Sequence, residues 1–318
     1  MNTSFDRVIS ETLQNHGTEI FDNITTNNAL LYLLKKRDNI KVVAGGRKFT
    51  HPLFYKINTS FKSYGKLDVI DTPVMDDITK ADYDIKTVAG SLVISTVEEA
   101  QNAGDKQKLL DLADTVRMAA ENSMSEVLGD QVWATGAVAN DFDGLQQLVS
   151  LTPSTQTDVG GIDSSTYEYW RNYVNTTGTG TFNTAQAGLK LMNTALNSCT
   201  FGRKGPRAVI TTKAVYALYE IGLASNIRYA TTELADAGFI HLAYTTMPVL
   251  FDDNCPSGCM YFVDTDSLWL QVLAQGNMKV TPFEYSHNQL SKTALMYIIG
   301  NLTTGSRRTN GVLSAITA

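Results

Sequence analysis

The chain has 318 residues, a net charge of −6 and a 43% hydrophobic content, enough apolar material for one large core or two modest ones. Charged residues make up 18%, below the ~25% typical of soluble proteins, which we interpret as a sign of a surface covered by partners. The acidic balance argues against a dedicated nucleic-acid-binding protein, which would carry a basic face. No run of 18 apolar residues occurs, so no membrane span is expected.

Residues 1–43 are predicted to form an N-terminal arm. Asn27 or Asn28 is placed to cap a short helix over residues 29–37, whose leucines repeat at helical spacing. Lys35, Lys36 and Arg37 suit a helix C-terminus, where cations meet the negative end of the dipole. We interpret these cations as a solvated helix end rather than as a contact with enclosed nucleic acid.

Residues 44–92 are predicted to form one long β-hairpin. From 48 to 63 the side chains alternate between two faces, which is the period of a strand. A polar, turn-rich stretch follows over 64–77, and a second extended segment returns over 79–95. An arm of ~18 residues at ~3.3 Å each would reach ~60 Å, and an isolated two-stranded hairpin is barely stable in water. The hairpin is therefore expected to lie on its own domain or on a neighbouring subunit.

Residues 97–130 are predicted to form a long spine helix. Asp105 is the expected N-cap and Gly129 the expected C-terminal stop. Its apolar stripe consists of Leu109, Leu112, Val116, Ala119, Ser123 and Val127. About 25 residues at 1.5 Å per residue give a length of ~37 Å.

The second half of the chain reads as a mixed α+β region. The Gly/Thr run over 175–181 is a candidate hinge. The turn 252–258 is expected to join an extended pair, and the polar loop 286–292 another. The expected elements are a helix over 184–198, a strand over 208–211, a helix over 213–223, and extended runs over 247–251, 260–264, 278–285 and 293–301.

Motifs for catalysis and cofactor binding are missing from the sequence. Neither a dinucleotide-binding glycine motif nor a P-loop is present, and Gly160-Gly161 is interpreted as a bend. No nucleophile elbow occurs, and the four histidines stand in no metal-binding pattern. We therefore expect no enzyme activity, no cofactor and no metal.

Cysteines and acidic clusters are the remaining candidate metal ligands in the sequence. Cys255 and Cys259 are interpreted as free thiols at a turn, with a disulfide or a zinc site as alternatives. Three cysteines and no secretion signal lead us to expect folding in a reducing cytosol. The acids at 141–143 and 252–253 lack the glutamate that completes a calcium loop, so they are interpreted as solvated turns.

An aromatic cluster follows the double glycine and consists of Tyr167, Tyr169, Trp170 and Tyr173. Stacking on nucleobases would need a basic surround, and only Arg171 is adjacent. Tyr and Trp combine apolar area with a polar tip, which suits interfaces. The cluster is therefore expected to pack at a domain junction or at a subunit contact.

The order of parts resembles the major capsid protein of tailed bacteriophages, the Hong Kong 97 fold. That order is arm, overlong hairpin, spine helix, aromatic segment, Gly/Thr hinge, α+β domain and final strand pair, and it covers residues 27–318. Four stretches are similar to the family: HPLFYKIN (51–58), EEAQNAG (98–104), VGGIDSSTYEYWRN (159–172) and MPVLFDDNCPSG (247–258).

The resemblance implies an α+β capsid fold with a defined domain plan. It implies an N-terminal arm (1–43), an extended loop (44–92) and a peripheral domain with the spine helix (93–180). It further implies an axial domain (181–275), peripheral-domain strands (276–304) and a C-terminal tail (305–318). The glycines of 159–172 would bend the chain after the spine helix, and the aromatics would anchor the packing of the peripheral domain.

The implied contacts between subunits lie on the extended loop and the aromatic segment. In this role the extended loop reaches over a neighbouring subunit. The expected contact residues are Phe49, Leu53, Tyr55, Ile57, Phe61, Lys62, Tyr64, Lys66, Tyr167, Trp170 and Arg171.

The resemblance implies a structural virion protein that assembles in the host cytoplasm. Its subunits would form the pentamers and hexamers of an icosahedral shell around double-stranded DNA, which is held without sequence specificity. The short arm leads us to expect a separate scaffolding protein, with a portal and a cement protein as further partners. An encapsulin-like nanocompartment enclosing cargo enzymes is the alternative, and a soluble enzyme without a linear motif is a distant third.

Overall fold

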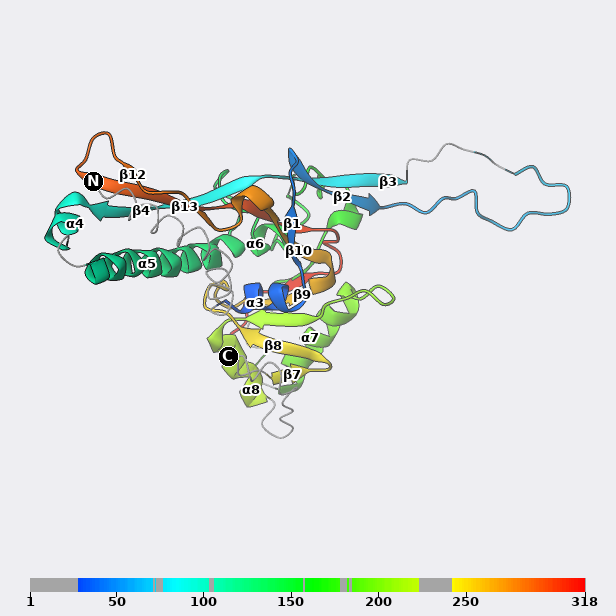
Figure 1. Ribbon diagram of the computed structural model, residues 1–318. Helices are drawn as coiled ribbons and strands as arrows, with labels where there is room; N and C mark the ends of the chain where they lie inside the picture. Colours follow the sequence, from blue (N-terminus) through cyan, green and yellow to red (C-terminus); the bar gives the residue numbers. More distant parts are fainter. Residues whose placement is uncertain are drawn as a thin grey trace.

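The computed structural model describes residues 28–70, 72, 77–102, 106–156, 158–177, 182, 185–222 and 242–317. Within these ranges the strands form two six-stranded sheets and a separate two-stranded ribbon, with helices packed around the sheets (Figure 1). No helix in the described part is long and apolar enough to cross a membrane. The mixed α+β organisation is the one that the sequence predicts.

The first sheet is built around β13 (Ser291–Thr304), a 14-residue strand. Strand β4 (Lys86–Ser95) pairs with it antiparallel along one edge. Along the other edge β12 (Glu284–Tyr285), β11 (Lys279–Val280) and β10 (Leu268–Leu273) pair in turn, which confirms the final strand pair. Strand β1 (Ile40–Val43) then adds to β10 in parallel, a pairing that the sequence did not predict.

The predicted helix after the arm is present as α3 (Ala29–Lys36). Asn28 is its N-cap, because Asn28 Oδ1 accepts a hydrogen bond from Leu31 N at 3.0 Å. Leu30, Leu31, Leu33 and Leu34 are buried, and α3 packs against both α5 and β10. This part of the expected arm is therefore integrated into the core, whereas residues 1–27 lie outside the described residues.

The predicted spine helix is divided between α4 (Thr96–Asn102) and α5 (Lys106–Val132). The expected N-cap, Asp105, lies outside the described residues. Helix α5 continues past Gly129, so the expectation that this glycine ends the helix is wrong. A Cβ at position 129 would lie 2.7 Å from Asn254 Nδ2. The glycine lies where the Asn254 side chain approaches the helix, so a larger residue there would require the Asn254 amide to shift.

Over residues 116–132, where the side chains of α5 are described, the buried stripe is rotated from the predicted one; Leu109 and Leu112 lie outside this range. Met124, Leu128 and Val132 are buried, whereas Ala119, Ser123 and Val127 of the predicted stripe are exposed. The buried side of α5 faces β4 and the core beneath it. The predicted stripe instead borders a groove that is open to solvent beside β4.

The predicted hairpin is correct in its base and wrong in its extent. Strands β2 (Lys48–Phe54) and β3 (Ile78–Asp84) pair antiparallel over seven residues each, and the pairing ends at Phe54 and Ile78. After Ile85 the chain leaves this ribbon, because β4 pairs with β13 instead. Alternation of side chains predicts which of them share a face, but it does not show whether a partner strand is present to pair with the segment.

The second sheet has the order β5-β14-β9-β6-β8-β7, with α7 (Ala185–Cys199) and α8 (Lys213–Gly222) packed beside it. Both helices and the buried strand β6 match the prediction. The strands are β5 (Tyr173–Asn175), β6 (Ala208–Thr211), β7 (Leu242–Tyr244), β8 (Met247–Phe251), β9 (Met260–Val263) and β14 (Gly311–Leu313).

Both members of the extended pair that the turn 252–258 joins are present, as β8 and β9, but they are not neighbours in the sheet, because β6 lies between them and pairs with both. The segment expected as a C-terminal tail contains β14, which pairs with β5 and β9. The remaining short elements are α6 (Leu145–Leu148), η1 (Glu168–Trp170), η2 (Thr265–Ser267) and η3 (Ala274–Gly276).

Candidate assembly surface

The loop that joins β2 to β3 extends far from the rest of the chain (Figure 1). We call its described residues 55–70, 72 and 77 the projecting loop. Ile57 and Phe61 are 86% exposed and Leu67 is 94% exposed. Such a series of exposed apolar side chains makes the loop a candidate interaction surface. The exposed apolar residues on the loop and the adjoining strand ends are Phe54, Ile57, Phe61, Leu67, Val69, Ile70 and Ile78.

One backbone hydrogen bond closes the base of the projecting loop, from Tyr55 N to Asp77 O at 3.2 Å, and the side-chain hydrogen bonds farther out join near neighbours in sequence. Asn58 Oδ1 accepts from Ser60 N at 2.9 Å, and the Tyr64 hydroxyl donates to Ser60 O at 2.7 Å. Asp68 Oδ2 accepts from Gly65 N at 2.6 Å. These bonds shape short turns, as Asn and Asp commonly do next to the backbone. They leave the apolar side chains of the loop available to another surface.

The base of the ribbon is held by His51, which is half-buried. Its ring stacks on Trp269 with centroids 4.8 Å apart, and its Nε2 lies 2.9 Å from Thr303 Oγ1 and 3.1 Å from Gln271 Nε2. Burial, with a smaller contribution from Lys41, lowers the pKa of His51 to about 4. The imidazole is therefore neutral near pH 7 and packs as an aromatic plate between β2 and the first sheet.

The double glycine forms a tight turn that packs against the ribbon. Gly160 has φ +64° and Gly161 φ +71°, and Val159 and Ile162 bridge across them. The carbonyl of Gly160 accepts from Asp82 N at 2.9 Å. A Cβ at position 160 would lie 3.0 Å from Cζ of Tyr83. The glycines thus bend the chain, as predicted, and also admit the buried ring of Tyr83.

The aromatic segment packs within its own chain. Trp170 is buried, and its Nε1 donates to Val159 O at 2.8 Å. Arg171 donates from Nε to Ser164 O and from a terminal nitrogen to Ser165 O, each at 2.6 Å. Tyr169 stacks on Tyr55 with centroids 5.1 Å apart. The segment therefore supports the start of the projecting loop from below.

The eleven expected contact residues fall into three groups by exposure. Phe49, Leu53 and Trp170 are buried within the chain, and Tyr55, Tyr64 and Arg171 are partly buried. The structure brings Tyr55 together with the aromatic segment, whereas the other loop residues lie farther out (Figure 1). Sequence reasoning missed Leu67, Val69 and Ile70, although apolar residues inside a turn-rich stretch were a usable signal. The exposed members are Ile57, Phe61, Lys62, Lys66 and Tyr167.

An apolar groove lies between α5 and β4. Its volume is about 330 Å³, and its lining includes Val88, Val93, Ala119, Met124 and Val127. Val93 is 47% exposed and Val127 42% exposed. Branched apolar side chains on a helix and a neighbouring strand offer a surface into which apolar side chains of another segment would fit.

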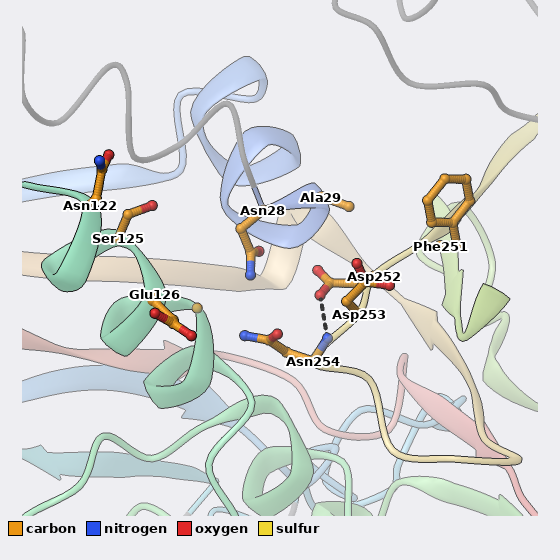
Figure 2. A pocket seen from close by; sticks show the side chains of 10 residues that line it. Asn28, Ala29, Asn122, Ser125, Glu126, Phe251, Asp252, Asp253 and Asn254 are labelled. Carbon is orange, nitrogen blue, oxygen red and sulfur yellow. Dashed lines mark hydrogen bonds between the residues drawn. The ribbon is translucent and has the colours of Figure 1, made fainter.

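A polar cleft lies where α3, α5 and the β8–β9 turn meet (Figure 2). Its central carboxylate, Asp252, is buried and accepts hydrogen bonds from Leu30 N and Asn254 N. Burial raises the pKa of Asp252. The expectation of a solvated turn is wrong for Asp252, because this residue helps to cap α3. The expectation is correct for Asp253, which is exposed and pairs with Lys213.

The cysteines are free and buried. Burial raises the pKa of Cys199 to about 12 and also raises the pKa values of Cys255 and Cys259. Thiols of this kind stay protonated at neutral pH and react slowly. Their free state agrees with the interpretation of Cys255 and Cys259. Within the described residues, no three His, Cys, Asp or Glu side chains gather closely enough to hold a metal ion.

Comparison with solved structures relates this architecture to viral shells. A chain from the capsid asymmetric unit of cyanophage A-1(L) matches with a TM-score of 0.69 and 16% identity over 93% of this chain and 94% of that chain. The chain has the Hong Kong 97 fold. At this identity the similarity establishes the fold alone. No protein-family model matches the sequence, and no curated protein sequence matches it.

The Hong Kong 97 fold is shared by further shell structures. The holo-SrpI encapsulin complex from Synechococcus elongatus PCC 7942 matches with a TM-score of 0.56 and 10% identity, covering 87% of this chain and 84% of that chain. A chain of the satellite phage P4 procapsid that includes the size determination protein matches with a TM-score of 0.53 and 12% identity, covering 94% and 90%. The matched structures with this fold therefore include both phage shells and an encapsulin.

Proposed function

We propose that this chain is the major capsid protein of a tailed bacteriophage. Its subunits form the pentamers and hexamers of a closed icosahedral shell around double-stranded DNA, and the protein resides in the virion after assembly in the host cytoplasm. Its role is structural rather than catalytic. The observation that carries the proposal is the projecting loop, a segment with exposed apolar side chains that reaches away from the body of a chain with a shell-forming fold. A separate scaffolding protein, a portal and a cement protein are the further proposed partners.

The projecting loop is proposed to lie on a neighbouring copy, against the groove between α5 and β4. Exposed Ile57, Phe61 and Leu67 offer apolar knobs, and the groove offers an apolar floor. Removal of apolar surface from water favours this contact by roughly 25 cal/mol per Å². A contact of ~800 Å² on each partner would have the size of a standard stable interface. Repetition around the shell would multiply the effect of each contact.

The proposed domain plan keeps the predicted division but reassigns strands according to the sheet in which they pair and shortens the extended loop. The peripheral domain takes α5 and the first sheet, and the axial domain takes the second sheet with α7 and α8. Strand β10 then belongs to the peripheral domain, because it pairs with β13 and β1. Strand β14 belongs to the axial domain, because it pairs with β5 and β9. The extended loop is limited to the ribbon β2–β3 and the projecting loop.

Deletion of residues 61–76 tests the role of the projecting loop. The subunit is expected to stay folded, because the paired ribbon ends at Phe54 and Ile78, and the Tyr55 N–Asp77 O bond that closes the loop base lies outside the deleted residues. Closed shells are expected to disappear. Circular dichroism and thermal unfolding check the fold, and negative-stain microscopy checks the shells.

A double substitution that keeps the length of the loop complements that deletion. Ile57→Ser with Phe61→Ser keeps the loop length and removes two exposed apolar side chains, so it should lower the yield of shells without lowering subunit stability. Normal shells from the deleted chain would sink the proposed role of the loop.

An encapsulin-like nanocompartment is the second candidate function, favoured by the structural match to the encapsulin complex. The phage assignment is preferred because the cyanophage capsid chain matches with the higher TM-score. The contents of shells purified from the native source separate the two. Nuclease-protected DNA supports a capsid, and an enclosed protein cargo without DNA supports a nanocompartment.

A further inference from the structure

A basic turn follows helix α7. Phe201 and Lys204 bridge across two residues, with Phe201 N donating to Lys204 O at 2.7 Å and Lys204 N to Phe201 O at 3.1 Å. Gly202 has φ +63°, which a two-residue hairpin of this kind requires at its first central position. The turn is therefore held by its own backbone, and it presents Arg203 and Lys204 to solvent.

Arg308 joins this turn from the other end of the chain. Its guanidinium carbon lies 3.8 Å from the centroid of the Phe201 ring, a cation–π contact that fixes the side chain beside the turn. We call Arg203, Lys204 and Arg308 the basic patch. In the part of the chain that the structure describes, no member of the patch forms an ion pair with a carboxylate. The neighbouring Arg207, by contrast, pairs with Asp266 at 3.2 Å.

An open cleft of about 400 Å³ adjoins the patch and shares Phe201 and Arg308 with it. Arg171 also lines the cleft, and Glu168 is the acid among its lining residues. The cations around this cleft therefore outnumber the acids, on a chain whose net charge is −6. Unneutralised cations gathered on a fixed scaffold favour a polyanionic partner, because like charges held together repel until an anion lies between them.

The ring faces argue for a phosphate backbone rather than for exposed bases. Base stacking needs open aromatic faces. Three aromatic rings line the cleft: the Phe201 ring carries Arg308, the Tyr169 ring stacks on Tyr55, and Tyr173 packs against the core of the second sheet. Phosphates need only accessible cations, which Arg and Lys supply in different ways, Arg as a planar fork and Lys as a flexible point charge.

We propose that the basic patch binds the phosphate backbone of double-stranded DNA without sequence specificity. The inference rests on the proposed capsid function, because it places the patch on the surface that meets the enclosed genome. Contacts of this kind release condensed counterions, so binding weakens as salt rises, with a slope set by the number of phosphates contacted.

Fluorescence anisotropy with a labelled duplex of about 20 base pairs and mixed sequence tests this proposal, over salt from about 50 to 200 mM. The full chain is expected to bind with an affinity that falls linearly on logarithmic axes. Arg203→Ala with Lys204→Ala should reduce the salt slope by about two, one unit for each lost phosphate contact. Lys35→Ala with Lys36→Ala removes equal charge from an exposed helix end and should leave the slope unchanged.

Shell assembly is measured on the same variants, which separates this proposal from the proposed function. If all variants form shells and only Arg203→Ala with Lys204→Ala loses DNA binding, the result supports both the patch and the capsid function. If the wild-type chain makes no shells but Arg203→Ala with Lys204→Ala still loses DNA binding, the result supports the patch and contradicts the capsid function. An unchanged salt slope, or equal losses in both double variants, overturns the patch. Failed assembly with unchanged DNA binding also overturns it and assigns the turn to a contact between subunits.

Discussion

Tyr83 and Gly160 are in contact at the base of the ribbon, where single residues attach β3 to the rest of the chain. Tyr83 is 1% exposed and its hydroxyl donates to Thr304 O at 3.0 Å, which ties β3 to the end of β13. Gly160 lies against the ring of Tyr83 and binds the neighbouring Asp82 N. The sequence identified the glycines as a bend, but the ring that they accommodate lies 77 positions away and leaves no local signal.

Gly160→Ala is expected to destabilise the subunit for two reasons. An L-residue at φ +64° costs roughly 1–2 kcal/mol, and the new methyl group would contact the buried Tyr83 ring. Gly161→Ala is the matched control, because it has a similar φ of +71° but no atom within 4 Å of the added Cβ. Urea unfolding of both variants measures the difference, and equal losses of stability would show that the ring contact contributes nothing.

His51 gives a pH prediction at the same scale. Its folded pKa is about 4, below the ordinary value of 6.5, because burial disfavours the charged ring. Well above pH 6.5 the ring is neutral in both the folded and the unfolded chain, so its contribution to the free energy of unfolding is fully present. As pH falls from about 6.5 to 4 the unfolded chain takes up a proton that the folded chain refuses, so the free energy of unfolding declines.

The variant His51→Gln isolates this effect from other titrating groups. The stability difference between wild type and variant, measured by urea unfolding at several pH values, should be constant above pH 6.5 and should shrink toward pH 4. A difference that stays constant across the whole range would contradict the buried neutral ring.

At the scale of elements, the sequence predicted those whose period and capping are local. Asn28 before α3, the alternation through β2, and the apolar strand β6 all carry their signal within a few residues. Errors and omissions arose where a distant partner decides the outcome. The alternation beyond Phe54 has no sheet to join, and β8 and β9 are separated because β6 is inserted between them. Strands β1 and β10 were missed for the same reason, because they pair with each other across the length of the chain.

At the scale of the whole molecule, buried polar residues connect segments that are far apart in sequence. Arg307 is fully buried and donates to Leu148 O and Gln156 Oε1, each at 2.7 Å. Asn301 and Lys86 both bind Asp143, joining β13 and β4 to the segment before α6. These contacts hold the body of the subunit together while the projecting loop reaches outward. The sequence identified the loop. It could not tell which of the predicted contact residues are buried within the chain and which are exposed.

The most direct test of the shell assignment is the mass of the particles that the purified chain forms. Light scattering, with negative-stain microscopy of the same peak, should find closed particles of megadalton mass. If only rings of five or six subunits appear, co-expression with the proposed scaffolding protein should convert them to closed shells. Monomers or small oligomers under both conditions would contradict the account, because a projecting apolar loop without a shell to join would then have no role.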